Sequence, residues 1–433
     1  MHDLKVIVVG AGIGGLQTAL ALAADGHSVT VLESVKKFLE VGAGIRVPPN
    51  SVRLSGSWGV DFKTIPKETS LGNRFMDWHG NHLLDCPFDD VQDRYGAPYY
   101  FIHRADLIDA LVSAVKRTPR IILRMGTPVA SYDFDSPAVN TTSGERISAD
   151  LVICADGIKS AARPSITGSS INPIDTGDVA YRILVPTASL LASPDPHIRS
   201  LVTNPWAVHW LGPEGHAVGY PLRNGTLYNI IIDVTHTTDL GAPLELDEWR
   251  SDVDNHCLVE RFKDWCPAVR ELCALTGRYL KWKLADFKEL ERWVEGRKGK
   301  VALLGDACHP MMPYLAQGAA QATEDAAALA AVLRTYDDIP TALKAYEAQR
   351  KPRSAYIAYN TRVLQNWLHL YDGEEQRRRD ELMQHDNSEN PIFWGFSERK
   401  DWLFGHNSAN LSLSQPIPLP PSMPAAGSSV YLN

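Results

Sequence analysis

The first 33 residues alternate between apolar runs and short glycine-containing turns. Leu4–Val9 is rich in β-branched residues, which is typical of a parallel strand covered on both faces. Residues 12–24 favour a buried helix that ends at Asp25–Gly26, and Ser28–Glu33 follows as a second buried strand. Because glycines interrupt this apolar stretch, it predicts a βαβ unit rather than a signal peptide or a membrane span. No other stretch approaches about 18 uncharged apolar residues, so we expect no membrane segment.

Strand-like runs recur later in the chain, with a different texture between them. Leu151–Ala155 and Val301–Gly305 resemble the first buried strand, and each runs into a glycine-containing turn. Between them, His216–Leu222 and Thr226–Val234 predict a hairpin, because the Asn-Gly pair that separates them suits a turn with two positive φ angles. We therefore expect an α/β fold in which a Rossmann-like nucleotide-binding domain is split by an inserted antiparallel β-sheet domain.

The last third of the chain predicts helices followed by a proline-rich tail. Ala319–Leu333 and Ile339–Leu370 favour helices, and Asp372–Gln384 predicts a charged, solvated helix. Prolines at positions 416, 418, 420, 421 and 424 predict a disordered or extended tail. The expected division assigns 1–169 and 296–371 to the two parts of the nucleotide-binding domain with its long helix, 170–295 to the inserted domain, and 372–433 to the charged helix and tail.

Composition narrows the choice of partners. The net charge is −8 and 44% of the residues are hydrophobic, as in ordinary globular proteins. This charge argues against nucleic acid as the main partner, but arginines can still gather in a pocket for an anionic small substrate. The six cysteines show no C-x-x-C spacing, so we expect neither disulfides nor zinc, and a reducing, cytoplasmic setting.

Gly10, Gly12 and Gly15 form a G-x-G-x-x-G motif between the first strand and the first helix. Gly10 permits the tight turn, Gly12 lets the backbone approach a pyrophosphate, and Gly15 lets helix and strand pack closely. The N-terminus of the helix then offers free N–H groups and the positive end of its dipole to the phosphates. Glu33, at the end of the second strand, is placed to accept the ribose hydroxyls of an adenosine, which favours FAD or NAD over NADP.

A second segment, Gly305–Gly318, distinguishes between these cofactors. It lies between a buried strand and a helix, so its polar residues are expected at the carboxyl end of the sheet. Asp306 can accept hydrogen bonds from a ribityl chain, which NAD lacks. Pro313 stiffens the loop, Gly318 lets the backbone touch a flat ring, and the helix from Ala319 aims its positive end at a flavin. The two segments together predict FAD.

These motifs resemble those of the class A flavoprotein monooxygenases, the FAD-dependent aromatic hydroxylases, and most closely their salicylate hydroxylase-like branch. The resemblance covers residues 1 to about 370. Besides the two segments above, it rests on four further matches: Gly42–Ile45 with Pro48–Asn50, Arg104 in His-Arg-Ala-Asp-Leu, Cys154–Ser160 with Arg163, and Glu324–Ala326.

The resemblance implies that NADH or NADPH reduces the flavin, that O2 forms a flavin C4a-hydroperoxide, and that this species hydroxylates an electron-rich aromatic carbon. Such enzymes have no separate nicotinamide domain, and the chain has no second G-x-G-x-x-G. By the same resemblance Asp156 and Gly157 serve both FAD and pyridine nucleotide binding, and Arg104 lies along the ribityl–pyrophosphate chain. The simpler alternatives are that Asp156 ends a strand and caps the next helix, and that Arg104 is a surface arginine.

Because the flavin supplies the oxidative chemistry, the inserted sheet is expected to supply substrate specificity. In relatives an arginine at the position of Arg182 binds a phenolate or carboxylate or polarises the oxygenated flavin; the alternative is that it faces solvent. His209 is expected to accept a phenol proton or to be a neutral structural histidine. Arg46 is expected to pair with the flavin or with an acidic substrate. Tyr220 and Trp210 are either walls for a flat aromatic ring or simple core residues.

The chain offers no spacing typical of a metal site, since Cys308 and His309 are adjacent on a predicted tight turn and lack further partners. The leading interpretation is a monooxygenase of a phenol, a benzoate-like acid or an indole-type metabolite, acting as a monomer or homodimer. One alternative is an FAD oxidase or dehydrogenase on the same fold. A more remote one is a flavoprotein that binds its ligand without turnover.

Overall fold

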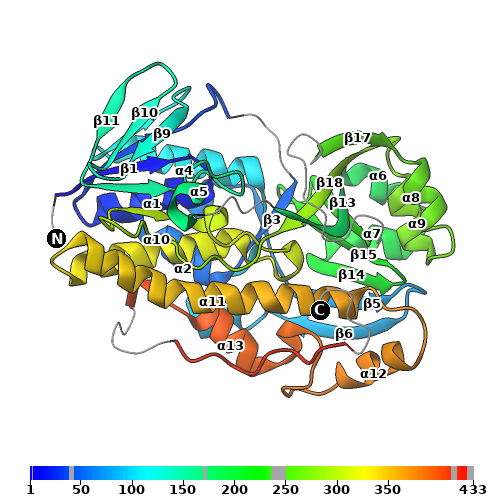
Figure 1. Cartoon of the computed structure of the whole chain (residues 1–433). Coiled ribbons are helices and arrows are strands. Elements are labelled where there is room, and N and C mark those ends of the chain that lie inside the picture. Colours follow the sequence, from blue (N-terminus) through cyan, green and yellow to red (C-terminus); the bar gives the residue numbers. More distant parts are fainter. Residues whose placement is uncertain (2, 39–42, 169–172, 236–249, 411–416, 427–433) are drawn as a thin grey trace.

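The computed structural model describes residues 1, 3–38, 43–168, 173–235, 250–410 and 417–426. A five-stranded parallel sheet forms the centre of one half of the molecule (Figure 1). In spatial order its strands are β19 (Val301–Leu303), β12 (Leu151–Cys154), β1 (Lys5–Val9), β2 (Ser28–Leu32) and β8 (Ile121–Arg124). β1 pairs in parallel with β12, and β12 pairs in parallel with β19, so the carboxyl ends of these three strands meet at one edge. This sheet agrees with the predicted nucleotide-binding sheet that is split in sequence, because β19 comes almost 150 residues after its neighbour β12.

Two three-stranded antiparallel sheets and a set of helices accompany this sheet. One small sheet contains β9 (Val129–Asp133), β10 (Ala138–Thr141) and β11 (Arg146–Ser148), and the other contains β3 (Gly44–Val47), β7 (Tyr100–His103) and β4 (Lys67–Thr69). The helices are α1 (Ile13–Ala24), α2 (Pro49–Ser57), η1 (Phe62–Thr64), α3 (Val91–Tyr95), α4 (Arg104–Arg117), α5 (Arg163–Thr167), η2 (Gly305–Ala307), η3 (Pro313–Leu315) and α10 (Gly318–Thr335). α1 packs against α10, which joins the beginning of the chain to the segment that follows residue 300.

An eight-stranded sheet forms the other half of the molecule (Figure 1). Its order is β17 (Arg250–Asp254), β18 (Arg278–Asp286), β13 (Ile174–Pro186), β16 (Leu227–Thr235), β15 (Gly215–Leu222), β14 (Trp206–Gly212), β5 (Gly72–Asp77) and β6 (His82–Pro87). The predicted hairpin is confirmed as β15 and β16, which pair antiparallel from Leu222 opposite Leu227, and Asn224 and Gly225 have positive φ as expected. β5 and β6 were not expected in this sheet, because they precede residue 170; the proposed division into domains stays a prediction.

The two faces of the eight-stranded sheet differ in what covers them. α6 (Thr187–Leu191), α7 (Pro196–Thr203), α8 (His256–Arg261) and α9 (Pro267–Ala274) lie on the side that carries Trp210 and Tyr181, and the side chains there form one apolar core. The opposite face carries Phe75, Val218 and Tyr220, and packs against residues of α11 (Ile339–Leu368) and the C-terminal segment. Because side chains alternate along a strand, each strand contributes to both cores.

The C-terminal segment is more ordered than predicted. It contains α12 (Glu374–Leu382), η4 (Phe393–Gly395), α13 (Ser397–Gly405) and η5 (Ser408–Asn410). The stretch 417–426 has no regular secondary structure, as its prolines suggest, yet Tyr356 and Arg399 donate to the carbonyl of Pro421 and Trp367 donates to that of Pro424. For this stretch the expectation of disorder is wrong and that of an extended chain is right; residues 411–416 and 427–433 lie outside the described residues. The charged α12 is not wholly solvated either, because Arg379 is only 1% exposed.

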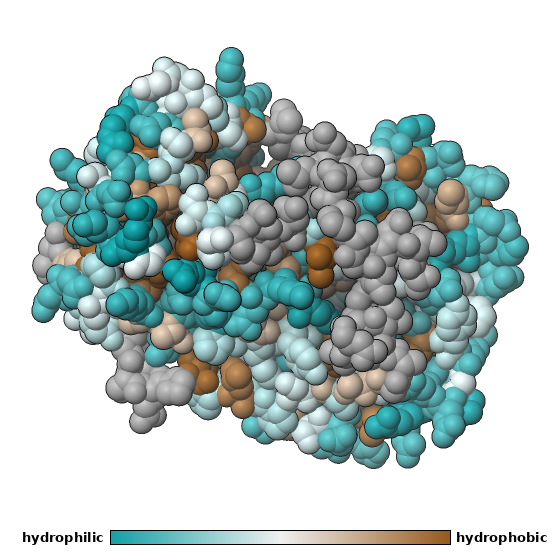
Figure 2. Space-filling view, in the orientation of Figure 1, coloured by the Kyte–Doolittle hydropathy of each residue, from teal (hydrophilic) through white to brown (hydrophobic). Residues whose placement is uncertain are grey.

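The visible surface is mainly hydrophilic, with hydrophobic residues scattered over it (Figure 2). The large exposed hydrophobic residues, such as Ile122 and Tyr371, come from separate elements. Among the described helices, none combines the length and the apolar character needed to cross a membrane.

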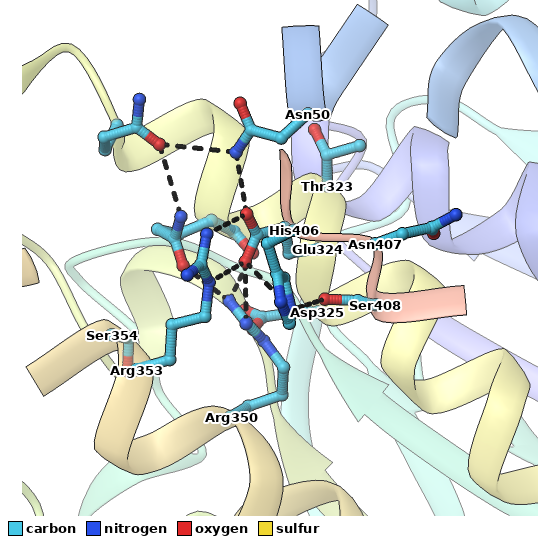
Figure 3. A network of polar contacts seen from close by, with 12 residues as sticks. Asn50, Thr323, Glu324, Asp325, Arg350, Arg353, Ser354, His406, Asn407 and Ser408 are labelled. Carbon is cyan, nitrogen blue, oxygen red and sulfur yellow. Dashed lines mark hydrogen bonds and ion pairs between the residues drawn. The ribbon is translucent and has the colours of Figure 1, made fainter. Parts of the chain in front are cut away.

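A buried network of charges joins α10, α11 and the loop after β19 (Figure 3). Glu324 accepts hydrogen bonds from Arg350 at 2.8 Å and from Arg353 at 2.7 Å, and Asp325 accepts from Arg350 at 2.8 Å. All four side chains have no exposed surface. Burial alone would raise the pKa of Glu324, but Arg353 and Arg350 outweigh it and hold this pKa well below its usual range. Asn50 of α2 donates to Glu324 at 2.7 Å, so the network also reaches a third helix.

We predict that Glu324→Leu strongly destabilises the protein. The substitution leaves two buried guanidiniums without their shared carboxylate, and breaking a buried ion pair costs about 3–5 kcal/mol. The midpoint of urea unfolding, followed by circular dichroism, should therefore fall well below that of the wild type. As a control, Asp252→Asn removes the exposed pair with Arg278, whose side chains are both 64% exposed, and should leave the midpoint unchanged. An unchanged midpoint in Glu324→Leu would contradict this account.

Candidate functional site

The glycine motif forms an open cradle at the carboxyl end of β1. Gly10 has a φ of +100°, and a Cβ there would lie 2.4 Å from the carbonyl oxygen of Ala155. A Cβ on Gly15 would lie 2.0 Å from the carbonyl oxygen of Gly10, so both positions require glycine for packing. Gly12 differs, because no atom lies within 4 Å of the place where its Cβ would be. α1 begins directly after it without a side-chain cap, so its first N–H groups stay available for a pyrophosphate.

Glu33 lies beside this cradle, as predicted. One of its carboxylate oxygens accepts from the backbone N–H of Ala11 at 2.8 Å, and the other accepts from the N–H of Val35 at 3.0 Å. These bonds fix the carboxylate and leave further lone pairs for the two hydroxyls of a ribose. Glu33 and Gly12 line a cavity of about 520 Å³, and Arg104, the first residue of α4, lines the same cavity. Arg104 is therefore exposed, but to the crevice and not simply to the outer surface.

Asp156 and Gly157 follow β12 at the same edge and line an adjoining cavity of about 290 Å³ with Gly10 and Glu33. One oxygen of Asp156 accepts from the N–H of Ala161 at 3.0 Å and from the hydroxyl of Tyr132 at 3.3 Å. The other oxygen is buried and has no hydrogen-bond partner among the described residues. Asp156 therefore lies just after β12 and orders the loop before α5, but it does not cap this helix, whose N-cap is Ala162 without a side-chain hydrogen bond.

The loop after β19 closes the crevice from its other side. Asp306 is open to solvent, yet the surrounding protein limits its hydration and raises its pKa, while His309 and Arg104 act in the opposite direction. Pro313 begins η3, and Gly318 and Ala319 begin α10, which has no side-chain cap. The unpaired N–H groups of this first turn and its positive dipole end suit the electron-rich edge of a flavin ring.

Arg163 ties the two halves of the crevice together. Its guanidinium donates to the carbonyl of Ala307 at 2.8 Å and to that of Gly157 at 3.3 Å, and it lies 4.4 Å from the centre of the Phe287 ring. It therefore connects the loop after β12 with the loop after β19. This explains on structural grounds why an arginine follows the Asp156 motif.

Three predicted substrate residues lie on the face of the eight-stranded sheet that carries Phe75. The register places His209 and Arg182 on this face, and Tyr220 occupies it two positions from Val218. Trp210 is a neighbour of His209 on β14, so it points to the opposite face, where it lines a separate cavity of about 330 Å³. The structure therefore does not bring Trp210 together with the other three residues.

Arg182 lies where this sheet meets the cofactor crevice. Its Nε is buried and has no hydrogen-bond partner in the part of the chain that the structure describes, and its guanidinium lies 5.1 Å from the centre of the Trp282 ring. Burial lowers its pKa, with Tyr220 and Asp233 raising it and Arg104 lowering it further. It is therefore close to Tyr220 on its own sheet and to Arg104 of the crevice. The alternative of a solvent-facing arginine does not fit this environment.

Arg46, expected to pair with the flavin or with an acidic substrate, is not among the residues that line the crevice of Glu33 and Arg104. It is 8% exposed, and its guanidinium donates to Asn73 Oδ1 at 3.3 Å and lies 3.5 Å from His209 Nε2. These contacts place it with the substrate-side face and not with Glu33 or Arg104. Burial, followed by Arg46, lowers the pKa of His209 well below its usual value, so His209 is neutral.

A chain of hydrogen-bonded, buried polar groups lies on the same face and was not predicted from the sequence. Asp178 accepts from the hydroxyl of Tyr314 and, at 2.7 Å, from that of Thr235, whose oxygen lies 2.8 Å from His369 Nδ1. Burial raises the pKa of Asp178 to about 7, while the bonds from Tyr314 and Thr235 act against this shift. Tyr314 belongs to η3 of the flavin-side loop, so the chain begins beside the cofactor crevice.

The chain continues through two histidines to a second acid. His369 Nε2 lies 2.8 Å from His216 Nδ1, and His216 Nε2 lies 3.3 Å from Asp233 Oδ2. Burial raises the pKa of Asp233 well above its usual value and lowers that of both histidines, that of His369 to about 3. The register of the predicted hairpin places His216 opposite Asp233. An acid inside an apolar strand, opposite a histidine, was therefore a signal of this pair that could be found in the sequence.

Cys308, His309 and Asp325 lie within 4.8 Å of one another, but their contacts explain them without a metal. Asp325 accepts from Arg350, from the N–H of Gly305 and from His309, so its oxygens are already used. Through Asp325, which Figure 3 labels, His309 adjoins the buried network of charges.

Comparisons with known proteins agree with this geometry. A family model described as an FAD binding domain matches residues 3–361. The FAD-dependent monooxygenase atnJ of Arthrinium sp is 36% identical over 386 residues, which are 87% of this chain and 88% of that protein. The 3-hydroxybenzoate 6-hydroxylase of Klebsiella oxytoca is 32% identical over 414 residues, 94% of this chain and 98% of that protein. Among solved structures, a salicylate hydroxylase in complex with substrate has a TM-score of 0.77 and 26% identity, and covers 94% of this chain and 96% of its own.

These matches cover both the glycine cradle and the loop after β19, and they extend over the eight-stranded sheet. The chain therefore belongs to the family of FAD-dependent monooxygenases of the class A aromatic hydroxylase type.

Proposed function

We propose that this protein uses NADH or NADPH and O2 to hydroxylate an electron-rich aromatic small molecule bound on the Arg182 face of the eight-stranded sheet. The observation that carries the proposal is the position of Arg182, a partly buried arginine without a described hydrogen bond, between the sheet and the crevice of Arg104. The names of the relatives support it, since they are monooxygenases and hydroxylases. We further infer that the protein is a cytoplasmic monomer or homodimer; the six unpaired cysteines support the reducing, cytoplasmic setting alone.

Different residues of the crevice would bind different parts of FAD. Glu33 would bind the adenosine ribose, the first turn of α1 the pyrophosphate, and Asp306 the ribityl chain. When bound, FAD supplies the two-electron redox chemistry and the activation of O2. The first turn of α10 would stabilise negative charge on the flavin ring through its free N–H groups and its positive dipole end.

On the substrate side, Arg182 would stabilise an ionised phenol. A guanidinium keeps its charge at working pH, and electrophilic oxygen transfer is faster to an electron-rich ring. Tyr220, which lies 4.7 Å from Phe101 between ring centres, forms an aromatic wall beside it. His209 stays neutral and therefore serves as a hydrogen-bond partner more readily than as a base that keeps the proton.

The buried chain offers a route for the phenol proton. With Asp233 protonated and Asp178 ionised, each group can donate toward Asp178: Asp233 to His216, His216 to His369, and His369 to Thr235. A proton taken up at the free oxygen of Asp233, Oδ1, can then move stepwise until Thr235 delivers one to Asp178. Asp233 lies close enough to Arg182 for the two to influence each other's pKa.

The function is tested by screening phenols, hydroxybenzoates and indoles for substrate-dependent oxidation of NADH or NADPH by the FAD-loaded protein. With ¹⁸O2, one atom of the label should enter the product for each nicotinamide oxidised. Formation of H2O2 without any labelled product from the whole panel would favour an oxidase and contradict the proposal.

Removing the carboxylate at either end of the crevice should weaken FAD binding. A hydrogen bond to a charged group contributes about 1.5–3 kcal/mol, so Glu33→Ala and Asp306→Ala should each raise the Kd for FAD by roughly 10- to 150-fold. Quenching of flavin fluorescence measures this Kd, and Asp252→Ala, far from the crevice, serves as the control. Wild-type affinity in both variants would mean that the two half-sites are wrongly placed.

The rate of product formation should depend on the ionisation of Asp178. Because burial raises the pKa of Asp178 to about 7, its carboxylate is protonated at lower pH and can no longer accept a proton. The kcat should therefore fall as the pH drops through about 7. Asp178→Asn cannot ionise, so it should be slow at every pH and lose this inflection. Thr235→Val interrupts the chain but keeps Asp178, and should be equally slow. An inflection near pH 7 that persists in Asp178→Asn would assign it to another group.

A further inference from the structure

Arg46 differs from the other deeply buried arginines because neither a carboxylate nor a backbone carbonyl of the described residues accepts a hydrogen bond from it. Its hydrogen-bonding contacts with described residues are Asn73 Oδ1 at 3.3 Å and His209 Nε2 at 3.5 Å, both neutral groups. No carboxylate of the described part of the chain lies within ion-pair distance of it. It is nevertheless only 8% exposed.

Other buried arginines of the chain are compensated by carboxylates or by backbone carbonyls. Arg350 and Arg353 share the carboxylate of Glu324, and Arg379 pairs with Asp380. Arg399 donates to the carbonyls of Asn390, Pro421 and Ser422 at 2.8 to 3.0 Å. Each of these is satisfied within the protein, whereas an uncompensated buried charge is strongly destabilising. The protein therefore tolerates at Arg46 a cost that it avoids elsewhere.

The groups around Arg46 are neutral at physiological pH. Burial raises the pKa of Tyr220 to about 12, and Arg46 and Arg182 only partly oppose this shift. Burial likewise keeps Asp233 protonated although Arg46 and Arg182 favour its ionised form. The positive charge is thus not cancelled by an ionised neighbour on this face.

Three polar atoms near Arg46 are also unsatisfied. Asn73 Nδ2, His209 Nδ1 and the hydroxyl of Tyr99 are buried without a hydrogen-bond partner. Tyr99 is close enough for Arg46 to lower its pKa against the effect of burial. Amide and phenol groups are hydrogen-bond donors, so the surroundings add donors to the guanidinium and suit an anion with several acceptor oxygens.

Aromatic rings enclose this charged position. The Arg46 guanidinium lies 5.8 Å from the centre of the Trp394 ring, and His209 stacks on Phe75 at 4.8 Å. Trp394 belongs to η4, in a segment that follows residue 361, where the match to the family model ends. Trp394 therefore comes from a part of the chain outside the residues that the family model matches.

We propose that Arg46 binds the carboxylate of a hydroxyaryl acid substrate, with Trp394 packing beside the bound group and Arg182 near its phenol. A carboxylate is planar and matches the fork of a guanidinium, which makes Arg46 a specificity-determining residue. This inference rests on the proposed function and narrows its substrate class from aromatic compounds to aromatic acids.

Equilibrium binding to the full-length, FAD-loaded protein tests the proposal without turnover. The probes are 3-hydroxybenzoate, 2-hydroxybenzoate and 2,4-dihydroxybenzoate, each compared by calorimetry with its primary amide. At least one acid should bind wild type roughly 10- to 150-fold more tightly than its amide, the range expected for a charge-assisted hydrogen bond. Arg46→Gln, which keeps a donor for Asn73, should remove this preference by weakening the acid alone, and Arg46→Lys should restore part of it. Equal affinities of acids and amides, or no binding of any acid, would overturn the proposal.

Thermal unfolding of the ligand-free holoenzyme gives a second readout that needs no substrate. Removing an uncompensated buried charge should raise the Tm of Arg46→Gln, by about 2 °C for each 1 kcal/mol in a large domain. Arg353→Gln, in the paired network, is the matched control and should lower the Tm. If Arg46→Gln lowers the Tm as well, the guanidinium is compensated inside the protein and the proposal fails.

The two failures are distinguishable. Wild-type protein that takes up no FAD, or that oxygenates nothing, refutes the proposed function. Protein that holds FAD and binds amides as well as acids refutes only the role of Arg46. A large loss of FAD affinity in Arg46→Gln would assign the guanidinium to the flavin and overturn the proposal as well.

Discussion

The sharing of two buried carboxylates between two buried guanidiniums is the interaction on which the cofactor site depends. Glu324, Asp325, Arg350 and Arg353 are all inaccessible to water, and each loses its hydration only because the others replace it. Asp325 also accepts from the N–H of Gly305 at 3.0 Å, so the network holds the loop that carries Asp306. The first turn of α10 and this loop are thereby fixed relative to each other before any ligand arrives.

On the substrate-side face, in contrast to this network, the buried arginines are not paired with described carboxylates. This holds for Arg46 and Arg182, and burial keeps His209 and Asp233 neutral. A protein selected for stability alone would pair or remove these charges. Paired charges therefore characterise the scaffold of the cofactor site, and the arginines without a described carboxylate partner lie where we propose that an anionic ligand binds.

The cofactor half was predictable from sequence because its chemistry is local. Gly10 and Gly15 are required by close contacts at the carboxyl end of β1 and the start of α1. Glu33 directly follows β2, which pairs with β1. The sequence also allowed the prediction that Trp210 and His209 face opposite sides of the sheet, because neighbours on a strand do so, but both residues were assigned to one pocket.

The surroundings of Arg46 could not be predicted from the sequence, because they depend on where η4 packs, almost 350 residues later in the chain. The same holds for the chain of buried groups, since Thr235 and His369 are 134 positions apart. Proline content correctly indicated a tail without regular structure but gave no sign that its carbonyls accept hydrogen bonds from Tyr356 and Trp367.

The central claim is that one FAD molecule spans both sequence-distant segments and presents its ring to the Arg182 face. The most direct measurement is a crystal structure of the FAD-bound protein. The account predicts the pyrophosphate at the first turn of α1, the ribose on Glu33, the ribityl chain beside Asp306, and the ring between the first turn of α10 and Arg182. Flavin density in the cavity behind Trp210, or a ring turned away from the eight-stranded sheet, would contradict it.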